Sequence, residues 1–229
     1  MKHLLLTALL CSFYINAVTQ VNLNQGLIAY YSFNGTANDV SGQNNNPTYN
    51  STTLTTDRYG NANSACNFDG INNYMIVPGT AGMNTATAMT VAMYFNTELT
   101  TLQNLIGKIN YNSGEGAQFQ VAINFNLYPG ILYGVNNPAD MCNSQIALNS
   151  AYVNTGGTVP TNQWHCLVCT YEAGVQKIYL NGLLVSTNNT SFNTLRQCTN
   201  SDIQIVTWWL NDQQRFKGKM DDIRIYTGH

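Results

Sequence analysis

The stretch Lys177-Ile-Tyr-Leu-Asn-Gly-Leu-Leu-Val185 decides the fold of this chain. Apolar residues alternate on both sides of an Asn-Gly pair, which is the strongest short-range signal for a β-hairpin. Asn181 and Gly182 can both adopt a positive φ, so they fit a two-residue turn whose twist matches that of the flanking strands. The stretch therefore predicts antiparallel β-structure.

Short runs of β-branched and aromatic residues recur on both sides of this hairpin, separated by Asn, Gly, Pro and Thr. No run after the N-terminal region shows a sustained helical period, and many short strands are typical of an all-β sandwich or barrel. The polar stretch from Asn34 to Asn63 lacks a strong strand signal, so we expect a surface loop there. The expected strands are Leu27 to Phe33, Tyr74 to Val77, Thr90 to Phe95, Phe119 to Phe125, Ile131 to Val135, Trp164 to Tyr171, Ile178 to Val185, Ile203 to Trp209 and Ile223 to Tyr226.

The N-terminus has the pattern of a secretory signal peptide. Lys2 precedes an apolar run from Leu4 to about Ala17, which is too short to span a bilayer. We expect residues 1–17 to be removed, leaving a secreted, extracellular protein that begins at Val18 or a few residues later. No other run is long and apolar enough for membrane insertion, and residues 18–229 have an ordinary length for one β-sandwich domain.

The charge balance excludes some classes of partner. Charged residues make up only 9% of the chain, and the formal net charge is -2. Removal of Lys2 with the signal peptide leaves 8 basic residues from 9, against 11 acidic residues, so the net charge becomes -3. A surface without a basic patch does not suit nucleic acid, whose phosphates attract clusters of Lys and Arg.

The chain has six cysteines, of which Cys11 lies in the expected signal peptide. Five remain, so we expect one or two disulfides in an oxidising compartment and at least one free thiol. Cys166 and Cys169 form a C-x-x-C within an expected strand, where a spacing of three places the side chains on opposite faces. We interpret them as packed small hydrophobes rather than a metal or redox pair. Cys142 and Cys198, in polar sequence, are the preferred candidates for a bridge, although spacing does not determine pairing.

Three separated segments share their order and spacing with a known family, across nearly all of the expected mature chain. They are Gly26-Leu-Ile-Ala-Tyr-Tyr-Ser-Phe-Asn-Gly35 with Asn38-Asp-Val-Ser-Gly42; Arg58-Tyr-Gly-Asn-Ala-Asn-Ser-Ala-Cys-Asn-Phe-Asp-Gly70 leading into Tyr74-Met-Ile-Val-Pro78; and Trp164-His165, Thr170-Tyr171 and the Asn181-Gly182 hairpin with the closing Gly218-Lys-Met-Asp-Asp-Ile-Arg-Ile-Tyr226. In these segments the chain resembles the laminin-G-like branch of the concanavalin A-like lectin/glucanase superfamily, and its secreted bacterial members most closely.

This resemblance implies a jelly-roll sandwich of two antiparallel sheets. It also implies a choice between several functions, because members of the superfamily bind carbohydrate or extracellular protein and some are glycosidases or polysaccharide lyases. The fold alone therefore does not separate a binding module from an enzyme.

The acidic residues favour a binding module. Retaining glycoside hydrolysis needs two carboxyl groups about 5 Å apart, and the similar glucanases carry them as alternating acids on one strand. Here Glu98, Glu115 and Glu172 are far apart in sequence, and Asp221 and Asp222 are adjacent strand residues expected on opposite faces. Distant acids can still meet in a folded chain, so a divergent polysaccharide-degrading enzyme, hydrolase or lyase, remains the alternative.

Asp221 is a candidate calcium ligand. By strand alternation it shares a face with Ile223 and Ile225, and a carboxylate beside an apolar layer needs a cation or several donors to stay ionised. In the similar glucanases, the acid three residues before the basic residue of the last strand helps to hold a structural calcium; here that position is Asp221. Asp39 could supply a second carboxylate to an ion that takes six to eight oxygens. The open alternative is that Asp39 caps a turn and Asp221 accepts backbone hydrogen bonds.

Trp208 is the candidate ligand-binding residue, because sugars pack on aromatic faces and pair with planar polar side chains. Ile203 and Ile205 share a face with Trp209, so alternation predicts a core position for Trp209 and an outward ring for Trp208. The alternative is that both rings pack in the core or at an edge. The sequence thus predicts a secreted, non-catalytic module that binds glycan or an extracellular protein, with a purely structural coat or adhesion protein as a further alternative.

Overall fold

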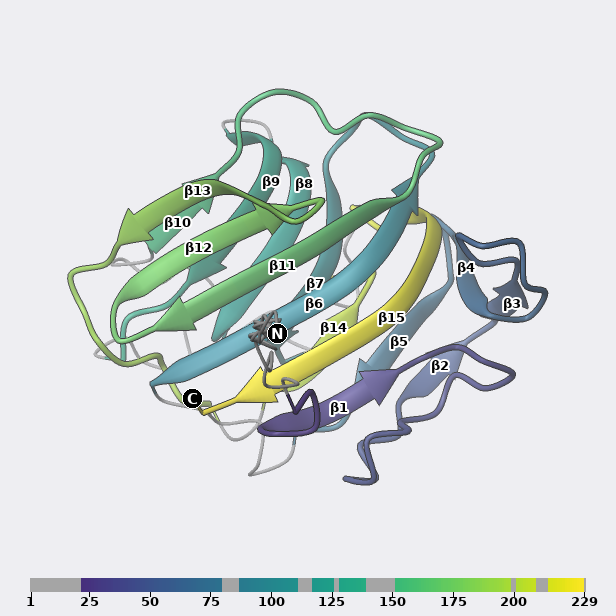
Figure 1. Ribbon diagram of the computed structural model, residues 1–229, viewed down its shortest axis with the longest axis horizontal. Coiled ribbons are helices and arrows are strands. Elements are labelled where there is room, and N and C mark those ends of the chain that lie inside the picture. Colours follow the sequence, from purple (N-terminus) through teal and green to yellow (C-terminus); the bar gives the residue numbers. More distant parts are fainter. Residues whose placement is uncertain are drawn as a thin grey trace, which may run out of the picture.

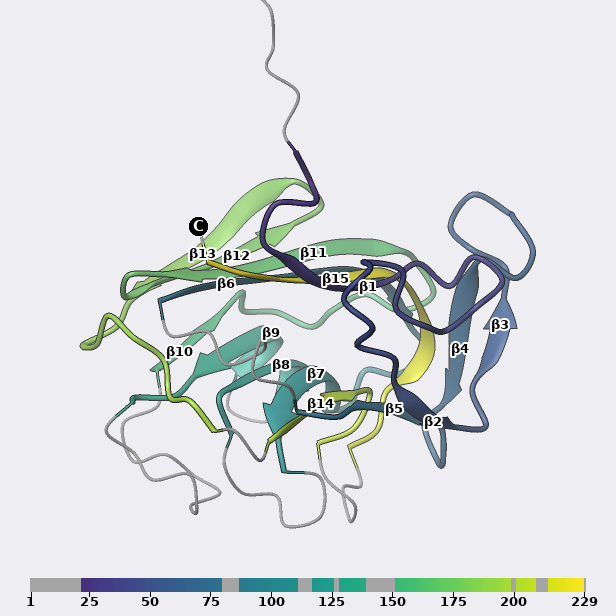
Figure 2. The ribbon, with the colours of Figure 1, turned by 90° about the horizontal axis from the view of Figure 1, so that it is seen from below.

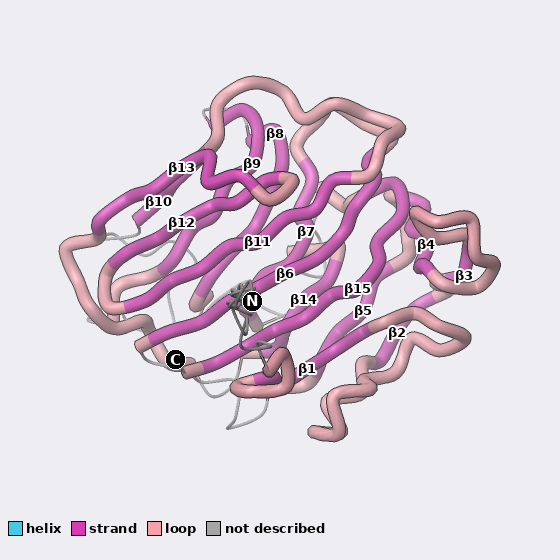
Figure 3. The backbone as a smooth tube through the Cα atoms, in the orientation of Figure 1, coloured by secondary structure: helices cyan, strands magenta, loops and turns pink. Residues whose placement is uncertain are grey.

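A computed structural model describes residues 22–79, 87–110, 117–125, 128–138, 151–198, 201–208 and 214–228 of the protein. The expected signal peptide, Cys142 and Trp209 lie outside the described residues. The described part consists of strands and loops without a helix (Figure 3), and so contains no helix long and apolar enough to cross a membrane. The strands are β1 (Leu27–Tyr31), β2 (Thr48–Asn50), β3 (Thr53–Thr55), β4 (Ala65–Asp69), β5 (Tyr74–Val77), β6 (Ala88–Thr97), β7 (Gln103–Ile109), β8 (Phe119–Phe125), β9 (Tyr128–Val135), β10 (Ala151–Asn154), β11 (His165–Glu172), β12 (Val175–Leu180), β13 (Leu183–Asn189), β14 (Asp202–Ile205) and β15 (Lys217–Thr227).

The strands form two antiparallel sheets that lie face to face (Figures 1 and 2). The first sheet has the order β13-β12-β11-β6-β15-β4-β3, and β1 also pairs with β15. The second sheet has the order β10-β9-β8-β7-β14-β5-β2. Neighbouring strands are often far apart in sequence, as β6 and β15 are, so the sheets close by long-range pairing. This architecture confirms the expected all-β jelly-roll sandwich.

Side-chain alternation along the strands builds the core between the two sheets. Leu167 and Cys169 on β11 and Val121 and Ile123 on β8 all belong to it and are buried. Burial of an aliphatic side chain of this size stabilises the fold by about 1.5–3 kcal/mol. Cys166 is half-buried on the other face of β11, so the predicted separation of the C-x-x-C pair is confirmed, and both cysteines are free thiols. The Cys142–Cys198 bridge stays a prediction.

The Asn-Gly hairpin forms as predicted. Asn181 and Gly182 join β12 to β13 with φ values of 52° and 83°, both in the left-handed region that this turn requires. The turn is also tied to the start of β11. The Cys166 N–H donates to Asn181 Oδ1 at 2.9 Å, and the Asn181 N–H donates to the Cys166 carbonyl at 2.8 Å.

The sequence-based expectations about strands were wrong at several places, and β4 and β10 were among the strands not expected. The stretch from Asn34 to Asn63 contains two short strands, β2 and β3, whose polar residues pair with β5 and β4. The buried strand β7 was not expected at all. All seven of its residues, including Lys108, are buried, so the polar-apolar alternation that marks a half-exposed strand is missing.

A β-bulge in β15 overturns the expected placement of Asp221. The register of β15 against β6 shifts between Asp221 and Arg224, and Asp222 has a φ of 50°. Met220 pairs with core residue Phe95, and Asp221 pairs with Tyr94 on the outer face. A bulge places one extra residue on one strand, so Asp221 and Asp222 lie on the same outer side rather than on opposite faces.

At Gly218 the backbone of β15 lies so close to that of β6 that there is no room for a Cβ atom. Its φ is 142°, and an added Cβ would overlap the Asn96 carbonyl oxygen, whereas Gly182 at φ 83° has nothing within 4 Å of an added Cβ. We expect Gly218→Ala to lower the free energy of unfolding by at least about 2 kcal/mol through strain and overlap, and Gly182→Ala by about 1 kcal/mol through backbone strain alone. Urea unfolding measures both. Equal losses would contradict the predicted backbone overlap.

Candidate functional site

One row of residues crosses the outer face of the second sheet. Its members pair directly across neighbouring strands, so they share one face of the sheet. The residues that alternate with them, such as Ile203, Val121 and Tyr133, belong to the core. The row therefore faces away from the first sheet. In strand order it consists of Gln204 on β14, Gly107 on β7, Gln120 on β8, Gly134 on β9 and Tyr152 on β10.

Two aromatic rings lie directly on the two glycines of this row. An added Cβ on Gly107 would lie 2.5 Å from Cζ3 of Trp208, and one on Gly134 would lie 2.7 Å from Cε1 of Tyr152. Trp208 is half-buried, and Tyr152 is 40% exposed. Because β8 separates β7 from β9, the two glycines are two strand spacings apart, or roughly 10 Å. We call Trp208 and Tyr152, with Gln120 between them, the aromatic platform.

Amide side chains adjoin the aromatic platform. The half-buried Gln120 donates from Nε2 to Oδ1 of the buried Asn104. Gln204 is fully buried and donates from Nε2 to the Ile109 carbonyl at 3.3 Å, while its Oε1 has no hydrogen-bond partner among the described residues. The face thus combines apolar rings with uncharged planar donors and acceptors.

The structure places the predicted ligand-binding residue, Trp208, beyond the end of its strand. β14 ends at Ile205, and Val206 has a φ of 64°, so regular alternation does not reach Trp208. The signal that sequence reasoning missed is the pair of glycines. A glycine inside a strand marks a site where another group approaches the backbone closely, and Gly107 and Gly134 both have an aromatic ring in that position. An aromatic ring that covers a strand glycine also stabilises the sheet, so the rings have a structural role as well.

Arg58 contacts both members of the acidic pair on the outer face of the first sheet. The guanidinium of Arg58 contacts Asp221 Oδ2 through Nη1 and donates through Nη2 to Asp222 Oδ2 at 2.7 Å. Its central carbon lies 3.8 Å from the centroid of the Tyr94 ring and 4.5 Å from that of Tyr59, so the cation makes a cation–π contact with each ring. We call these five residues the Arg58 clamp.

Hydrogen bonds extend the Arg58 clamp to the first strand. The Tyr30 hydroxyl donates to Asp222 Oδ1 at 2.6 Å, and Arg224 Nη2 donates to the Tyr30 hydroxyl at 2.9 Å. The Arg224 guanidinium also lies 4.3 Å from the Tyr30 ring centroid. β1 and β15 are therefore joined by side chains as well as by backbone pairing.

The two predicted metal ligands have separate partners. Asp39 accepts hydrogen bonds from the backbone N–H groups of Tyr30, Ser41 and Asn45 and from the Ser41 hydroxyl, each at 2.9 Å. Asp39 therefore caps a turn, which was the alternative to its being a metal ligand. Asp221 instead forms an ion pair with Arg58. The part of the chain that the structure describes contains no group of three or more His, Cys, Asp or Glu side chains that could hold a metal. These partners do not fit a calcium ion shared by Asp39 and Asp221. A calcium ion held by other oxygens, such as backbone carbonyls, stays a prediction.

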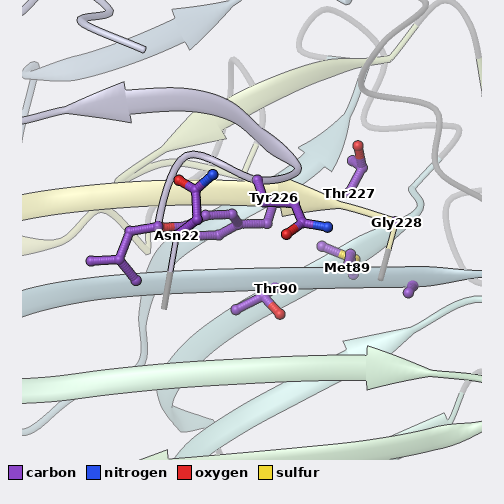
Figure 4. Close-up of a pocket in the computed structure, with 9 residues that line it drawn as sticks. Asn22, Met89, Thr90, Tyr226, Thr227 and Gly228 are labelled. Carbon is purple, nitrogen blue, oxygen red and sulfur yellow. The ribbon is translucent and has the colours of Figure 1, made fainter. Parts of the chain in front are cut away.

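A cavity of about 380 Å³ lies at the opposite face of the sandwich, beside the ends of β6 and β15 (Figure 4). Tyr226 forms part of its wall, and Asn22 and Thr90 contribute an amide and a hydroxyl. Its lining has no charged side chain. The cavity is built on the first sheet, so it is separate from the aromatic platform on the second.

The raised pKa of Asp221, a member of the Arg58 clamp, predicts that the stability of the protein falls as the pH rises from about 4 to about 6. Burial and the adjacent Asp222 raise the pKa of Asp221 to about 6, although Arg58 acts in the opposite direction; the usual pKa is about 3.9. Between these values the folded protein binds more protons than the unfolded chain, so this contribution to stability is complete below about pH 4 and is lost as pH rises through about 6. Two pKa units correspond to at most about 3 kcal/mol.

We expect Asp221→Asn to remove that loss of stability between about pH 4 and pH 6, as measured by urea unfolding at several pH values. Glu172→Gln, at an exposed position on β11, is the matched control and should keep the wild-type dependence. If the free energy of unfolding of Asp221→Asn fell with pH as steeply as that of the wild type, the pH dependence would not come from Asp221.

The calcium prediction has a direct thermal test. Because Arg58 already meets Asp221, we expect the midpoint of thermal unfolding to be unchanged when EDTA is added and when excess calcium is restored. A midpoint that falls with EDTA and recovers with calcium would instead support a bound ion.

Comparison with known proteins agrees with the architecture. Solved structures with the same fold include domain 4 of AbnA, an extracellular arabinanase of Geobacillus stearothermophilus, in complex with arabinotriose; it is 20% identical, with a TM-score of 0.60 over 88% of this chain and 92% of that one. The binding domain of Paraclostridial Mosquitocidal Protein 1 is 13% identical, with a TM-score of 0.67 over 90% of this chain and 50% of that one. A third structure is of botulinum neurotoxin type C, whose cell entry is described as dependent on interaction with two ganglioside molecules. It is 14% identical, with a TM-score of 0.59 over 89% of this chain and 48% of that one.

The chain therefore spans about half the length of these two toxin chains. At such low identity the likeness shows the fold alone. No curated protein sequence matches the chain. The family model of the concanavalin A-like lectin/glucanases superfamily matches residues 68–229, well over half of the sequence. The chain thus belongs to the concanavalin A-like lectin/glucanase superfamily, as its sequence segments indicated.

Proposed function

We propose that this protein is a non-catalytic carbohydrate-binding module that acts outside the cell, and that it binds glycan on the aromatic platform. The observation that carries this proposal is the pair of rings, Trp208 and Tyr152, that rest on Gly107 and Gly134. Both rings lie on one face of one sheet, at a spacing comparable to the length of a disaccharide.

The chemistry of the platform suits a neutral sugar. The C–H face of a pyranose or furanose ring is apolar and weakly positive, so it packs on the electron-rich face of an aromatic ring. Sugar hydroxyls pair with planar amides, and Gln120 lies between the two rings in the row. None of the residues of the row carries a formal charge, which favours a neutral glycan over an anionic one.

The related structures support a binding function at a coarser level. One of them contains arabinotriose, and another is described through its interaction with gangliosides. The extracellular location rests on the signal-peptide pattern at residues 1–17. An extracellular protein is the rival partner, and the glycan test below separates the two.

The acidic residues support binding rather than hydrolysis. Asp221 and Asp222 are both engaged by Arg58, and Glu98 lies 3.3 Å from the ammonium group of Lys217. A general acid and a nucleophile must instead reach the glycosidic bond. His165 is also held structurally, with Nε2 3.0 Å from the Pro160 carbonyl oxygen and its ring packed on Phe95.

A panel of neutral polysaccharides and their oligosaccharides, including arabinan, tests the proposal by retardation in affinity electrophoresis and by titration calorimetry. We expect retention by at least one glycan, and at least tenfold weaker binding for Trp208→Ala and for Tyr152→Ala; tenfold corresponds to about 1.4 kcal/mol. Tyr59→Ala, which removes a 73% exposed ring on the first sheet, is the matched control and should bind as the wild type does.

Three outcomes would reject the proposal. Unchanged affinity in both platform variants, with intact folding by circular dichroism, would place the site elsewhere. Release of new reducing ends or unsaturated products from the retained glycan would show that the protein is an enzyme. Indifference to every glycan tested would favour a protein partner.

A further inference from the structure

The cavity on the outer face of the first sheet has the size of a small-molecule site (Figure 4). Its volume of about 380 Å³ lies within the range of about 300–1,000 Å³ that is typical of such sites. Residues 22–25 form one wall, and the ends of β6 and β15 form the other. Tyr226 on β15 pairs with Thr90 on β6 and alternates with the core residue Ile225, so it belongs to the outer face.

Backbone hydrogen bonds fix the wall that residues 22–25 form. The Gln25 N–H donates to the Asn22 carbonyl at 3.2 Å, which closes a turn on the outer side of the sheet (Figure 2). Gly26 follows with a φ of 70°, and its carbonyl accepts from the Thr227 N–H at 2.9 Å. The turn is thereby attached to the end of β15. A cavity with fixed walls loses little conformational entropy when it binds a ligand.

The lining combines an aromatic ring with uncharged polar groups. Tyr226 is half-buried and contributes the ring. Asn22 and Gln25 contribute amides, and Thr90 contributes a hydroxyl. The Asn24 N–H donates to Asn22 Oδ1 at 3.1 Å, which holds the Asn22 amide against its own turn. Hydrogen-bond donors and acceptors thus lie around an apolar surface.

This combination favours one class of ligand over two others. A purely apolar molecule would remove the amides and the hydroxyl from water without giving them hydrogen-bond partners, which opposes binding. A charged molecule would meet no opposite charge, because the lining has no charged side chain. A neutral sugar satisfies both parts of the lining, since its C–H face packs on an aromatic ring and its hydroxyls pair with amides and hydroxyls.

We propose that this cavity is a second glycan site, and that it binds one neutral sugar unit, either a free monosaccharide or the end of a chain. Tyr226 is the one aromatic residue of its described lining, whereas the aromatic platform has two rings, so we expect a single stacked sugar and weaker binding. The two sites share no residue and lie on opposite faces of the sandwich. A module with both sites can hold two glycan chains at once.

Nuclear magnetic resonance of the isotope-labelled protein, titrated with glucose, galactose, arabinose and N-acetylglucosamine, tests the proposal. With at least one of these sugars, we expect saturable shifts of the backbone amides of Thr90, Thr227 and Gly228, which line the cavity. Thr90→Val removes the hydroxyl and keeps the β-branched shape, so it should raise the dissociation constant about threefold or more. Tyr226→Ala removes the ring and should raise it about tenfold or more.

Two matched controls lie on the same face of the first sheet, outside the lining. Thr170 pairs with Thr90 across β11 and β6, and Tyr179 is a half-buried ring on β12. Thr170→Val and Tyr179→Ala should bind the sugar as the wild type does. Trp208→Ala should also keep the shifts of the lining amides, which separates this site from the aromatic platform. Circular dichroism and thermal unfolding verify that each variant folds.

The same titration contains the results that would overturn the proposal. Shifts with oligosaccharides but not with monosaccharides would identify the bound unit as a chain end. An absence of saturable shifts with every sugar would overturn the proposal, as would an unchanged dissociation constant in both Thr90→Val and Tyr226→Ala. Shifts caused by cyclohexanol but by no sugar would overturn it in favour of an apolar ligand, and tighter binding of galacturonate than of galactose in favour of an anionic one.

Discussion

The contact of Arg58 with Asp221 and Asp222 is the interaction on which the arrangement of the first sheet depends. Two adjacent carboxylates on one side of a bulged strand repel each other, and Asp221 is almost fully buried. A buried charge without a partner destabilises a protein by several kcal/mol, roughly 3–5 when one member of a pair is removed. Arg58 supplies the opposite charge, and its guanidinium lies over the rings of Tyr94 and Tyr59. Because β15 pairs with β1, β4 and β6, the same contact stabilises the alignment of four strands.

Sequence reasoning succeeded where structure is determined locally. The Asn181-Gly182 turn needs only two residues with positive φ, and β5 and β8 begin and end as predicted because their apolar runs are bounded by polar or turn residues. It failed where the pairing of strands that are distant in the sequence determines the local structure. β7 is buried on both faces, so it has no alternation to detect, and the bulge at Asp222 depends on how β15 fits β6 rather than on its own sequence. That one-residue shift moved Asp221 from the predicted apolar layer to the outer face.

The candidate site was predictable only in part for the same reason. Trp208 could be singled out because a tryptophan near the end of a predicted strand is a common sugar platform. Tyr152 could not be joined to it, because the row that connects them crosses five strands whose order is set by long-range pairing. The positively charged partner of Asp221 was also hard to predict, because it comes from a distant part of the sequence. Resemblance to a family implied calcium, while the structure brings Arg58 to Asp221 from another part of the chain.

If the aromatic platform binds glycan as proposed, the glycines beneath the two rings have a consequence for the thermodynamics of binding. A ring that rests on backbone atoms cannot swing into the sheet. Trp208 and Tyr152 therefore lose much of their rotational freedom when the chain folds, before any ligand arrives. A rigid receptor face has little conformational entropy left to lose, so more of each contact with the ligand appears as affinity. Specificity would then follow from the fixed distance between the rings, which rejects ligands of a different repeat instead of adapting to them.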